Sequence, residues 1–547
     1  MNCASLTEEH ATLPDIIDQR AAVEPNRLFG AITRVDDNGK VHLRRVSYRD
    51  MSEAADRAAH WLLETLGRSE SFESSAYVGP ADLRYPILTM AAAKTGHKAL
   101  LLSSWAPVTA HAKLLAAASC RHLLVAGDDA DLVTAAQLAT AGTETRLHPS
   151  PSLEWLLDGP PTARYPISMT IDQLRGRDYA VIHTSGSTGD PKLIAWKFNA
   201  VAAIQWLGKP ECILPHGPTT LVKEVWKDKC HLLGLTPSHG VGLLALGPWA
   251  VYFNMPMILP PADRPLNPDI ASQIFQHDLC EAAIMAPAHL QALTRDAGKV
   301  DALRHLHHVI WAGAPFPSTT IADAVRSRVR IECAFGSSEA ALLALVPEHE
   351  DDYEWHNFHD LTGCQMRYFS EDLHEQILVR DPAFEKAQFV FQNFPDLDEF
   401  PTKDLFSRHP HRQNMWRFRG RKDDMITLST GRNIEPAPLE SAVASHSGVV
   451  AALVCGIGHT CPGLLVEAAV PPQTKQQAET LREEIWPTID KANEEMDQHA
   501  RIYKSMILFT SPKKPFQRAD KGSVLRARTL KDYEAEIATL YKDHETE

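Results

Sequence analysis

The segment Tyr179-Ala-Val-Ile-His183 runs directly into Thr184-Ser-Gly-Ser-Thr-Gly-Asp-Pro-Lys192. The first five residues are largely apolar and strand-like, whereas residues 185–190 hold three hydroxyl side chains and two glycines, a composition that disfavours a strand or helix interior. Such a loop can surround phosphate oxygens with backbone N–H groups and hydroxyls, and Lys192 would add a positive charge. On composition alone, an ordinary Ser/Gly surface loop fits equally well. The Walker A spacing is not met, because Pro191 stands where its second glycine is required.

Strand-like runs alternate with helical patterns on both sides of this loop. Helical spacing of apolar residues covers 50–66 and 106–118, and strand-like runs cover 75–78, 99–102, 180–183, 193–196, 282–285, 309–312 and 331–335. Strands interleaved with helices are typical of α/β folds with parallel sheets. The sequence therefore predicts a large α/β unit with parallel-type sheets.

The chain changes character after this unit. Residues 349–420 are polar and rich in turn-forming residues. Residues 421–547 are predicted to form a small α+β unit, with strands at 449–455 and 463–470, a charged helix at 476–499 and an amphipathic helix at 529–541. No repeat with a period of 20–50 residues is visible.

Composition and charge exclude several classes of protein. The 547 residues include 55 Lys and Arg and 69 Asp and Glu, so the formal net charge is −14, and 44% of the residues are hydrophobic. This usage excludes a disordered, collagen-like or coiled-coil protein. The acidic balance argues against a nucleic-acid partner, which requires a basic surface.

The cysteines, the N-terminus and the long uncharged stretch of the chain indicate in which compartment the protein is expected. None of the nine cysteines forms a C-x-x-C pair, which favours a reducing compartment and gives no zinc signal. The N-terminus lacks the basic start and apolar core of a secretory signal. Residues 230–262 carry no Asp, Glu, Lys or Arg, but five prolines divide them, so buried strands and turns are expected rather than a membrane span. We expect a cytoplasmic protein without a membrane segment.

Six further motifs follow the loop in a fixed order. They are Pro237-Ser-His-Gly240, Trp311-Ala-Gly-Ala-Pro315, Phe335-Gly-Ser-Ser-Glu339, Thr402-Lys-Asp-Leu405, Gly420-Arg-Lys-Asp-Asp424 with Gly431 and Ile434-Glu-Pro436, and Asp520-Lys-Gly522. Together with Thr184–Lys192 they resemble, over residues 25–545, the adenylate-forming superfamily of acyl-CoA synthetases, luciferases and nonribosomal peptide synthetase adenylation domains. The resemblance implies a large AMP-binding subdomain at 1–420, a small mobile subdomain at 421–547, and a hinge near Asp423.

The resemblance also implies an activity and its cofactors. Members of the superfamily join a carboxylate to the α-phosphate of ATP, release pyrophosphate and pass the acyl group to a thiol. ATP and Mg²⁺ would be required, and the thiol would be phosphopantetheine on a carrier domain or CoA. Because two anions must meet, neutralisation of charge dominates the barrier.

The site residues implied by the resemblance are those that match its motifs. The nucleotide-binding set is Thr184, Ser185, Gly186, Ser187, Thr188, Gly189, Lys192, Gly313, Ala314, Pro315, Ala334, Phe335, Gly336, Ser337, Ser338, Asp404, Phe418 and Arg421. Phe335 would stack on adenine, and Asp404 would accept hydrogen bonds from both ribose hydroxyls. Arg421 has the rigid fork that suits ribose and phosphate oxygens. Glu339 is the matched Mg²⁺ ligand, and the matched catalytic residues are Lys521, His239 and Glu339.

Three departures from the motifs matter. Lys403 replaces a glycine, which could alter the turn while leaving Asp404 in place. Phe335 replaces a tyrosine, which keeps the ring and loses a hydroxyl. The C-terminal motif is Asp520-Lys-Gly, so Lys513, Lys514 and Lys521 are alternatives for one role. Lys521 is favoured because Arg526 and Leu530 follow it at near-family spacing.

The acid-binding residues implied by the resemblance are His239, Val241, Gly242, Ala286, Pro287 and Gly313. Amino-acid-activating domains place an aspartate after the histidine region, and residues 235–243 contain no acid. A buried ammonium without a carboxylate would be costly. We therefore expect an acid without an α-amino group, most simply a benzoic or similar aryl acid.

Residues 81–85, 236–242 and 516–521 resemble the adenylation domain of fungal nonribosomal-peptide-synthetase-like and α-aminoadipate-type reductases. Those enzymes add a carrier domain and a reductase domain, so the chain is expected to be the excised first domain of a monomeric carboxylic acid reductase. A stand-alone acyl- or aryl-CoA ligase is one alternative. A catalytically inactive nucleotide-binding module is another, and pyrophosphate release with a panel of acids distinguishes them.

Overall fold

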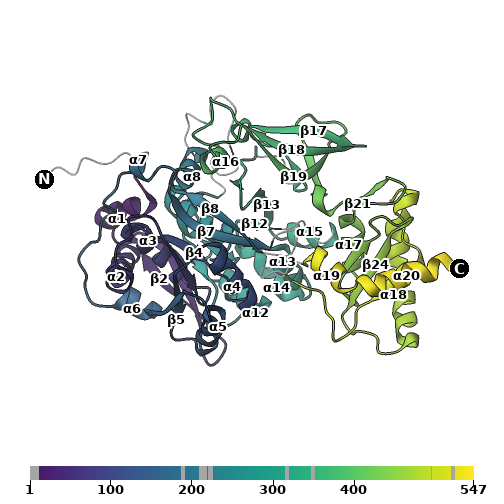
Figure 1. Ribbon diagram of the computed structural model, residues 1–547, viewed down its shortest axis with the longest axis horizontal. Helices are drawn as coiled ribbons and strands as arrows, with labels where there is room; N and C mark the ends of the chain where they lie inside the picture. The colour runs from purple at the N-terminus through teal and green to yellow at the C-terminus, as the bar shows by residue number, and fades with distance from the viewer. Residues whose placement is uncertain are drawn as a thin grey trace.

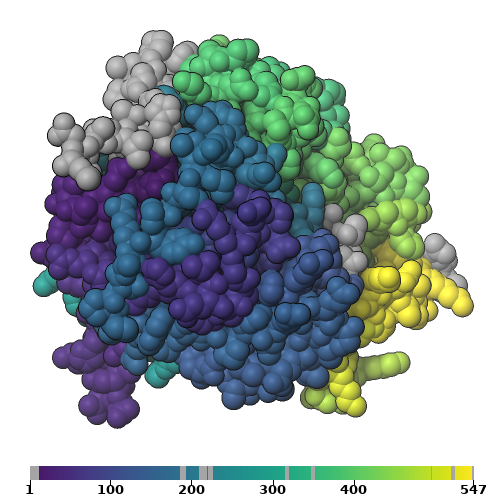
Figure 2. Space-filling model, turned by 60° about the vertical axis from the view of Figure 1, so that its left-hand side comes forward, coloured from purple at the N-terminus to yellow at the C-terminus, as the bar shows by residue number. Residues whose placement is uncertain are grey.

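The computed structural model describes residues 11–185, 191–208, 219, 226–313, 319–346, 352–494, 496–518 and 524–546. In Figure 1 two large sheets and their helices occupy the left and centre, a separate antiparallel sheet lies at the top, and the C-terminal part lies on the right. Figure 2 shows that the purple and blue N-terminal segments form most of one face, with the yellow C-terminal segment at its edge.

Two sheets form the large part of the molecule. The seven-stranded sheet has the order β13 (Arg330–Ala334), β12 (His308–Ala312), β11 (Ala282–Met285), β9 (His231–Gly234), β10 (Met257–Leu259), β1 (Leu28–Val35) and β2 (Val41–Ser47). The six-stranded sheet has the order β6 (Arg146–Ser150), β5 (His122–Ala126), β3 (Ser74–Val78), β4 (Lys98–Leu101), β7 (Asp178–Ser185) and β8 (Pro191–Lys197). Only the β1–β2 and β7–β8 pairs are antiparallel, so the predicted α/β class with parallel-type sheets is confirmed.

The inner strands of both sheets, such as β3, β9, β11 and β12, are buried on both faces. In the seven-stranded sheet, Leu232 and Val309 belong to an outer core, whereas Leu233 and Ile310 belong to the core shared by the two sheets. The six-stranded sheet divides its side chains between this shared core and another outer core in the same way. Successive side chains of a strand point to opposite faces, so both faces must be apolar in a sheet covered on both sides.

Helices cover these faces, and one is wholly enclosed. The helices of the large part are α1 (Leu13–Val23), α2 (Tyr48–Leu66), α3 (Arg84–Thr95), α4 (Val108–Ala117), α5 (Ala130–Thr140), α6 (Leu153–Asp158), α7 (Ile171–Leu174), α8 (Phe198–Ala203), α10 (Gly240–Leu244), α11 (Ala250–Tyr252), α12 (Pro268–Phe275), α13 (Pro287–Thr294), α14 (Ala297–Asp301), α15 (Thr319–Arg326) and α16 (Phe389–Asn393). Every residue of α3 is buried. In the part of the chain that the structure describes, no helix has both the length and the apolar character needed to cross a bilayer.

The segment predicted to be turn-rich is an antiparallel sheet. Its order is β16 (Trp355–His356), β20 (Trp416–Arg421), β19 (Glu399–Arg408), β18 (Leu373–Val379) and β17 (Cys364–Ser370). Most side chains of β17 are half-buried or exposed, and β19 contains a proline and an irregular register, so apolar alternation is weak. The pattern that identified the other strands is therefore missing here.

The C-terminal part has its own core. Strands β23 (Val449–Cys455), β24 (Gly463–Ala468) and β25 (Ile507–Phe509) form a sheet, and α17 (Ala437–Ala444) and α18 (Lys475–Glu494) contribute to its core. The helix expected at 529–541 is instead two helices, α19 (Arg526–Asp532) and α20 (Glu534–Thr546). They separate at Tyr533, whose buried hydroxyl donates to the carbonyl of Lys514.

Asn393 of α16 contacts the outermost strand of the six-stranded sheet. Its side-chain carbonyl accepts a hydrogen bond from Lys197 N (2.9 Å), and its amide donates to Ala195 O (2.8 Å). The side chain is buried, so both hydrogen bonds are sheltered from water.

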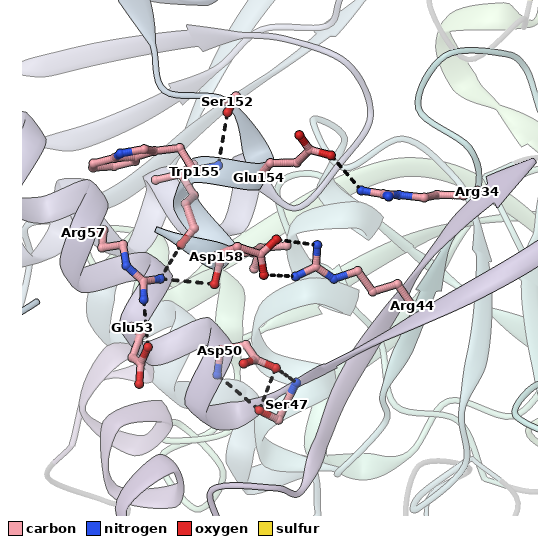
Figure 3. Close-up of polar contacts among 12 residues, drawn as sticks. Arg34, Arg44, Ser47, Asp50, Glu53, Arg57, Ser152, Glu154, Trp155 and Asp158 are labelled. Carbon is pink, nitrogen blue, oxygen red and sulfur yellow. Dashed lines mark hydrogen bonds and ion pairs between the residues drawn. The ribbon is translucent and has the colours of Figure 1, made fainter. Parts of the chain in front are cut away.

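Ion pairs connect α6 to β1 and β2, and hydrogen bonds connect it to α2 (Figure 3). Arg44 binds Asp158 with two hydrogen bonds, and Arg34 reaches Glu154 at 3.0 Å. Arg57 of α2 is only 4% exposed and donates to the carbonyls of Leu156 (2.7 Å), Leu157 (3.3 Å) and Pro160 (2.8 Å). The buried guanidinium therefore satisfies the C-terminal carbonyls of α6.

We expect Arg57→Met to lower the free energy of unfolding of the large part by about 2–4 kcal/mol, because buried carbonyls lose their donor. The matched control is Arg34→Met, which removes an exposed pair and should change the value by less than about 0.5 kcal/mol. The first transition in urea measures both. Equal effects of the two substitutions would contradict the role given to Arg57.

Candidate active site

The predicted adenine and acid residues lie at the carboxyl ends of neighbouring parallel strands. Met285 pairs with Gly234 on one side and Trp311 on the other, and Ala312 pairs with Ala334. The residues that follow, Ala286, Gly313 and Phe335, are thus placed along one edge of the seven-stranded sheet. Pro287 begins α13 beside Ala286. Ligands of open α/β sheets bind at this edge.

Two glycines in this region are required by backbone geometry. Gly313 has φ +90°, a conformation that side chains disfavour. Gly336 begins the short hairpin β14 (Gly336–Ser337) and β15 (Ala341–Leu342), and a Cβ there would lie 2.0 Å from Ala341 O. Ser337 Oγ accepts a hydrogen bond from Ala340 N at 3.1 Å. The hairpin fixes the backbone on both sides of Ser338 and Glu339.

The Ser/Gly segment joins two antiparallel strands. Thr184 of β7 pairs with Lys192 of β8, and Lys192 is exposed. Gly186, Ser187, Thr188 and Gly189, predicted to bind phosphate, lie outside the described residues, as does the side chain of Ser185. The structure thus places the two ends of the segment side by side.

The predicted acid-binding turn meets the predicted phosphate motif. His239 caps α10, and its Nδ1 accepts from Val241 N at 3.4 Å. A Cβ placed on Gly240 would lie 3.2 Å from Ile182 Cδ1 and 3.6 Å from Ser338 Oγ. The β7 strand, the His239–Gly240 turn and Ser338 therefore converge.

Trp196 of β8, which belongs to none of the predicted motifs, contacts the residues that converge here. Its indole N–H donates to Ser338 O at 2.8 Å, and the ring is fully buried. The signal available in the sequence was its place in the apolar run that follows Lys192.

Phe335 sits in a cluster of aromatic side chains. Its ring centroid lies 5.1 Å from that of His356 and 5.5–5.8 Å from those of Phe358, Phe406 and Phe418. Phe418 is one of the predicted nucleotide-binding residues, whereas His356, Phe358 and Phe406 come from the segment predicted to be turn-rich and match none of the motifs. Edge-to-face and tilted contacts of this kind fix ring orientation.

Asp404 lies on a β-bulge. Between the pairs Glu375–Leu405 and Ile377–Pro401 the register shifts, and Thr402 Oγ1 accepts from Asp404 N (3.1 Å) and donates to Gln376 O (3.0 Å). Lys403 has φ +65°, so it adopts the left-handed conformation that glycine favours. The lysine thus stands in a backbone conformation that a glycine would adopt without strain.

The Asp404 carboxyl faces Arg421 on the adjacent strand. The two residues pair in register, with Arg421 Nε 3.9 Å from Asp404 Oδ1. Burial raises the pKa of Asp404 to about 7, Arg421 opposes this rise, and the negative charges of Glu339 and Asp424 add to it. The structure thus brings together Asp404, Arg421 and Glu339 from three separate motifs.

The carboxylate of Glu339 suits a divalent cation carried by a nucleotide. Mg²⁺ uses one or two carboxylates plus phosphate oxygens rather than a protein cage. The like charge of Glu339 raises the pKa of Asp404, and a cation would relieve this repulsion. The residues present therefore fit the ion.

An apolar cavity lies behind the acid-binding turn. Its volume is about 10 Å³, and Leu13, Tyr85, Met90, Gly242 and Leu246 are among its lining residues. Among the described residues that line it, none is acidic. The space holds one water molecule at most and is too small for an aromatic acid.

The three alternative lysines differ in their surroundings. Lys514 pairs with Glu536 at 2.7 Å and lies over the Tyr533 ring, whereas Lys513 is exposed. Lys521 lies outside the described residues, as do Ala314 and Pro315 of the predicted adenine segment.

Known proteins resemble this chain in sequence and in fold. The AMP-binding enzyme family matches residues 19–363, and the AMP-binding enzyme C-terminal domain matches residues 423–545. A carboxylic acid reductase of Neurospora crassa is 30% identical over 540 residues, which cover 97% of this chain and 50% of that protein. The adenylate-forming reductase Nps11 of Serpula lacrymans is 29% identical over 381 residues, 66% of this chain and 33% of that protein.

A solved structure extends the comparison to the fold. The anthranilate CoA ligase AuaEII, in complex with anthranoyl-AMP, matches with a TM-score of 0.70 and 15% identity over 98% of this chain and 100% of the ligase. The chain spans about half the length of the Neurospora relative and a third of the Serpula relative. Because a family match covers more than half of the chain, and the matched motifs meet around Asp404 and Ser338, the chain belongs to the AMP-binding family of adenylate-forming enzymes.

Proposed function

We propose that the chain activates an aryl carboxylic acid with ATP and passes the acyl group to a phosphopantetheine thiol. A carboxylate oxygen attacks the α-phosphorus, the bond to the bridging oxygen breaks, and pyrophosphate leaves. The thiol sulfur then attacks the acyl carbon, its proton is released, and AMP leaves. The observation that carries the proposal is the proximity of the His239–Gly240 turn to Ser338, since a Cβ on Gly240 would lie 3.6 Å from Ser338 Oγ. This proximity would bring acid and α-phosphate together.

Each site residue has a part in this proposal. Phe335, Phe418, Ala334 and the backbone at Gly313 would hold adenine, and Asp404 with Arg421 would hold the ribose. The β7–β8 connection, with Thr184 and Lys192 at its ends, would bind phosphates. Mg²⁺ bound by Glu339 would neutralise phosphate charge, which is the chemistry that the ion supplies when bound.

The acid would lie between α10 and the carboxyl ends of β11 and β12. His239, Val241, Gly242, Ala286, Pro287 and Gly313 would surround it. The absence of an acid from residues 235–247 favours a substrate without an ammonium group. The lengths of the reductase relatives favour downstream carrier and reductase domains as partners.

Pyrophosphate exchange with a panel of acids tests the activity. We expect benzoic-type acids to exceed free α-amino acids by about 10²-fold or more, since a buried unpaired ammonium costs about 3–5 kcal/mol. Equal exchange with amino acids would refute the substrate class. Nucleotide binding without exchange for any acid would identify an inactive binding module, and acyl transfer to CoA but not to a carrier domain would identify a stand-alone ligase.

The raised pKa of Asp404 gives the proposed ribose contact a pH dependence. Only the ionised carboxylate accepts from both hydroxyls, so the affinity for adenosine should fall as the pH drops through about 7, by up to about tenfold per unit. Adenosine is the probe because it has no phosphate that titrates in this range. Calorimetric titration from pH 6 to 8.5 measures the effect. Asp404→Asn should bind weakly at every pH, and a flat profile for the unmodified chain would contradict the contact.

Lys521 is proposed to oppose the charge that builds as the carboxylate attacks. Lys521→Ala should slow adenylation by about 10²–10³-fold while sparing transfer from a preformed acyl adenylate. Lys514→Ala is the matched control, because Lys514 already pairs with Glu536. Loss of adenylation in Lys513→Ala or Lys514→Ala, with an active Lys521→Ala variant, would reassign the role.

A further inference from the structure

Three consecutive charged residues connect the antiparallel sheet to the C-terminal part. Lys422, Asp423 and Asp424 form a single turn between β20 and β21 (Ile426–Thr427), which pairs with β22 (Asn433–Ile434). This turn is the short connection through which the chain passes from one part to the other (Figure 1). A contact that restrains the backbone of this turn therefore also restrains the orientation of the C-terminal part relative to the antiparallel sheet.

The turn is bound on the sheet side by two ion pairs of opposite polarity. Lys403 Nζ on the β19 bulge lies 3.0 and 3.3 Å from the Asp423 carboxylate oxygens. Lys422 Nζ lies 2.8 Å from Glu375 Oε2 of β18. On the other side, Asp424 lies 3.8 Å from Arg526 of α19. The turn is thus held from both parts at once.

The conformation of Lys403 is unfavourable for a lysine. Its φ of +65° lies in the left-handed region, where a glycine would be free of strain. Packing of the side chain does not explain why a lysine stands here, because the side chain is 50% exposed. Its described ion-pair partner is Asp423. A glycine at this position would avoid the backbone strain, and the exposed lysine side chain adds little packing. We therefore take the positive charge of the side chain as the reason for a lysine here.

We propose that Lys403 is a positioning residue that holds Asp423, and with it the connecting turn, in the orientation seen here. The proposal rests on the two half-reactions of the proposed function. An ion pair that exists in one orientation of the C-terminal part stabilises that orientation against any other. The hinge predicted near Asp423 implies that adenylation and thiol transfer use different orientations of the C-terminal part, so removing the ion pair should shift the balance between the two steps.

The expected change in the ratio of the two half-reaction rates follows from the exposure of the Lys403–Asp423 pair. Exposed ion pairs shift an equilibrium by about two- to fivefold. In Lys403→Met we therefore expect one half-reaction to quicken and the other to slow, with the ratio of their rates changing about two- to fivefold. Pyrophosphate exchange measures adenylation, and single-turnover transfer from a preformed acyl adenylate to pantetheine measures the second step.

Three variants separate the charge from other effects. Lys403→Arg keeps the charge and should restore the unmodified ratio. Lys403→Gly removes the charge and the backbone strain together, and should shift the ratio as Lys403→Met does while raising stability. Arg34→Met removes the exposed Arg34–Glu154 pair between β1 and α6, away from the connecting turn, and should leave the ratio unchanged.

Salt and solution scattering supply readouts that a structural defect would not reproduce. Raising the ionic strength should move the unmodified chain toward the ratio of Lys403→Met. The variant should respond less, because it keeps the Lys422–Glu375 and Asp424–Arg526 pairs and lacks only the pair with Asp423. Small-angle scattering should show a broader range of separations between the two parts in Lys403→Met. Equal slowing of both half-reactions, or an unchanged ratio with unchanged scattering, would overturn the proposal. If the unmodified chain performs neither half-reaction, the proposed function fails, and the scattering comparison alone decides on Lys403.

Discussion

The need to bury both faces of two mostly parallel sheets determines where this protein can do chemistry. Strands such as β11 and β12 carry apolar side chains on both sides, and helices close over each face. A ligand is therefore expected where strands end. Ala286, Gly313 and Phe335 follow β11, β12 and β13 at one edge of the seven-stranded sheet, and Thr184 and Lys192 lie at the adjoining ends of β7 and β8 in the other sheet. The convergence on Ser338 is a consequence of this packing.

The buried strands could be predicted from their apolar runs. The long-range polar contacts could not be predicted from the sequence. The prediction for 282–285 coincides with β11, because a strand buried on both faces is apolar at each position. The antiparallel sheet was missed because its strands are half-exposed and lack that pattern. The helix expected at 529–541 divides at Tyr533, whose hydroxyl contacts the distant residue Lys514. Sequence spacing contains no information about such a contact.

In the candidate active site, too, residues in short motifs could be predicted, whereas contacts between distant segments could not. Short motifs identified Asp404, Arg421 and Glu339, and the structure brings them within electrostatic reach of one another. Motifs could not reveal the aromatic side chains around Phe335 or the hydrogen bond from Trp196 to Ser338, since these residues come from different segments. Lys403 was visible only as a departure from a pattern, and its partner Asp423 is 20 residues away in the chain.

The hydrogen bonds of Asn393 have a consequence for how molecules of this protein meet. Strand β8 ends its sheet, and an unpaired outer strand offers its N–H and C=O groups to any extended chain nearby. Asn393 occupies one donor and one acceptor of that strand with a side chain that cannot propagate a sheet. The amide thus blocks the addition of a further strand, and with it aggregation, at the carboxyl end of β8.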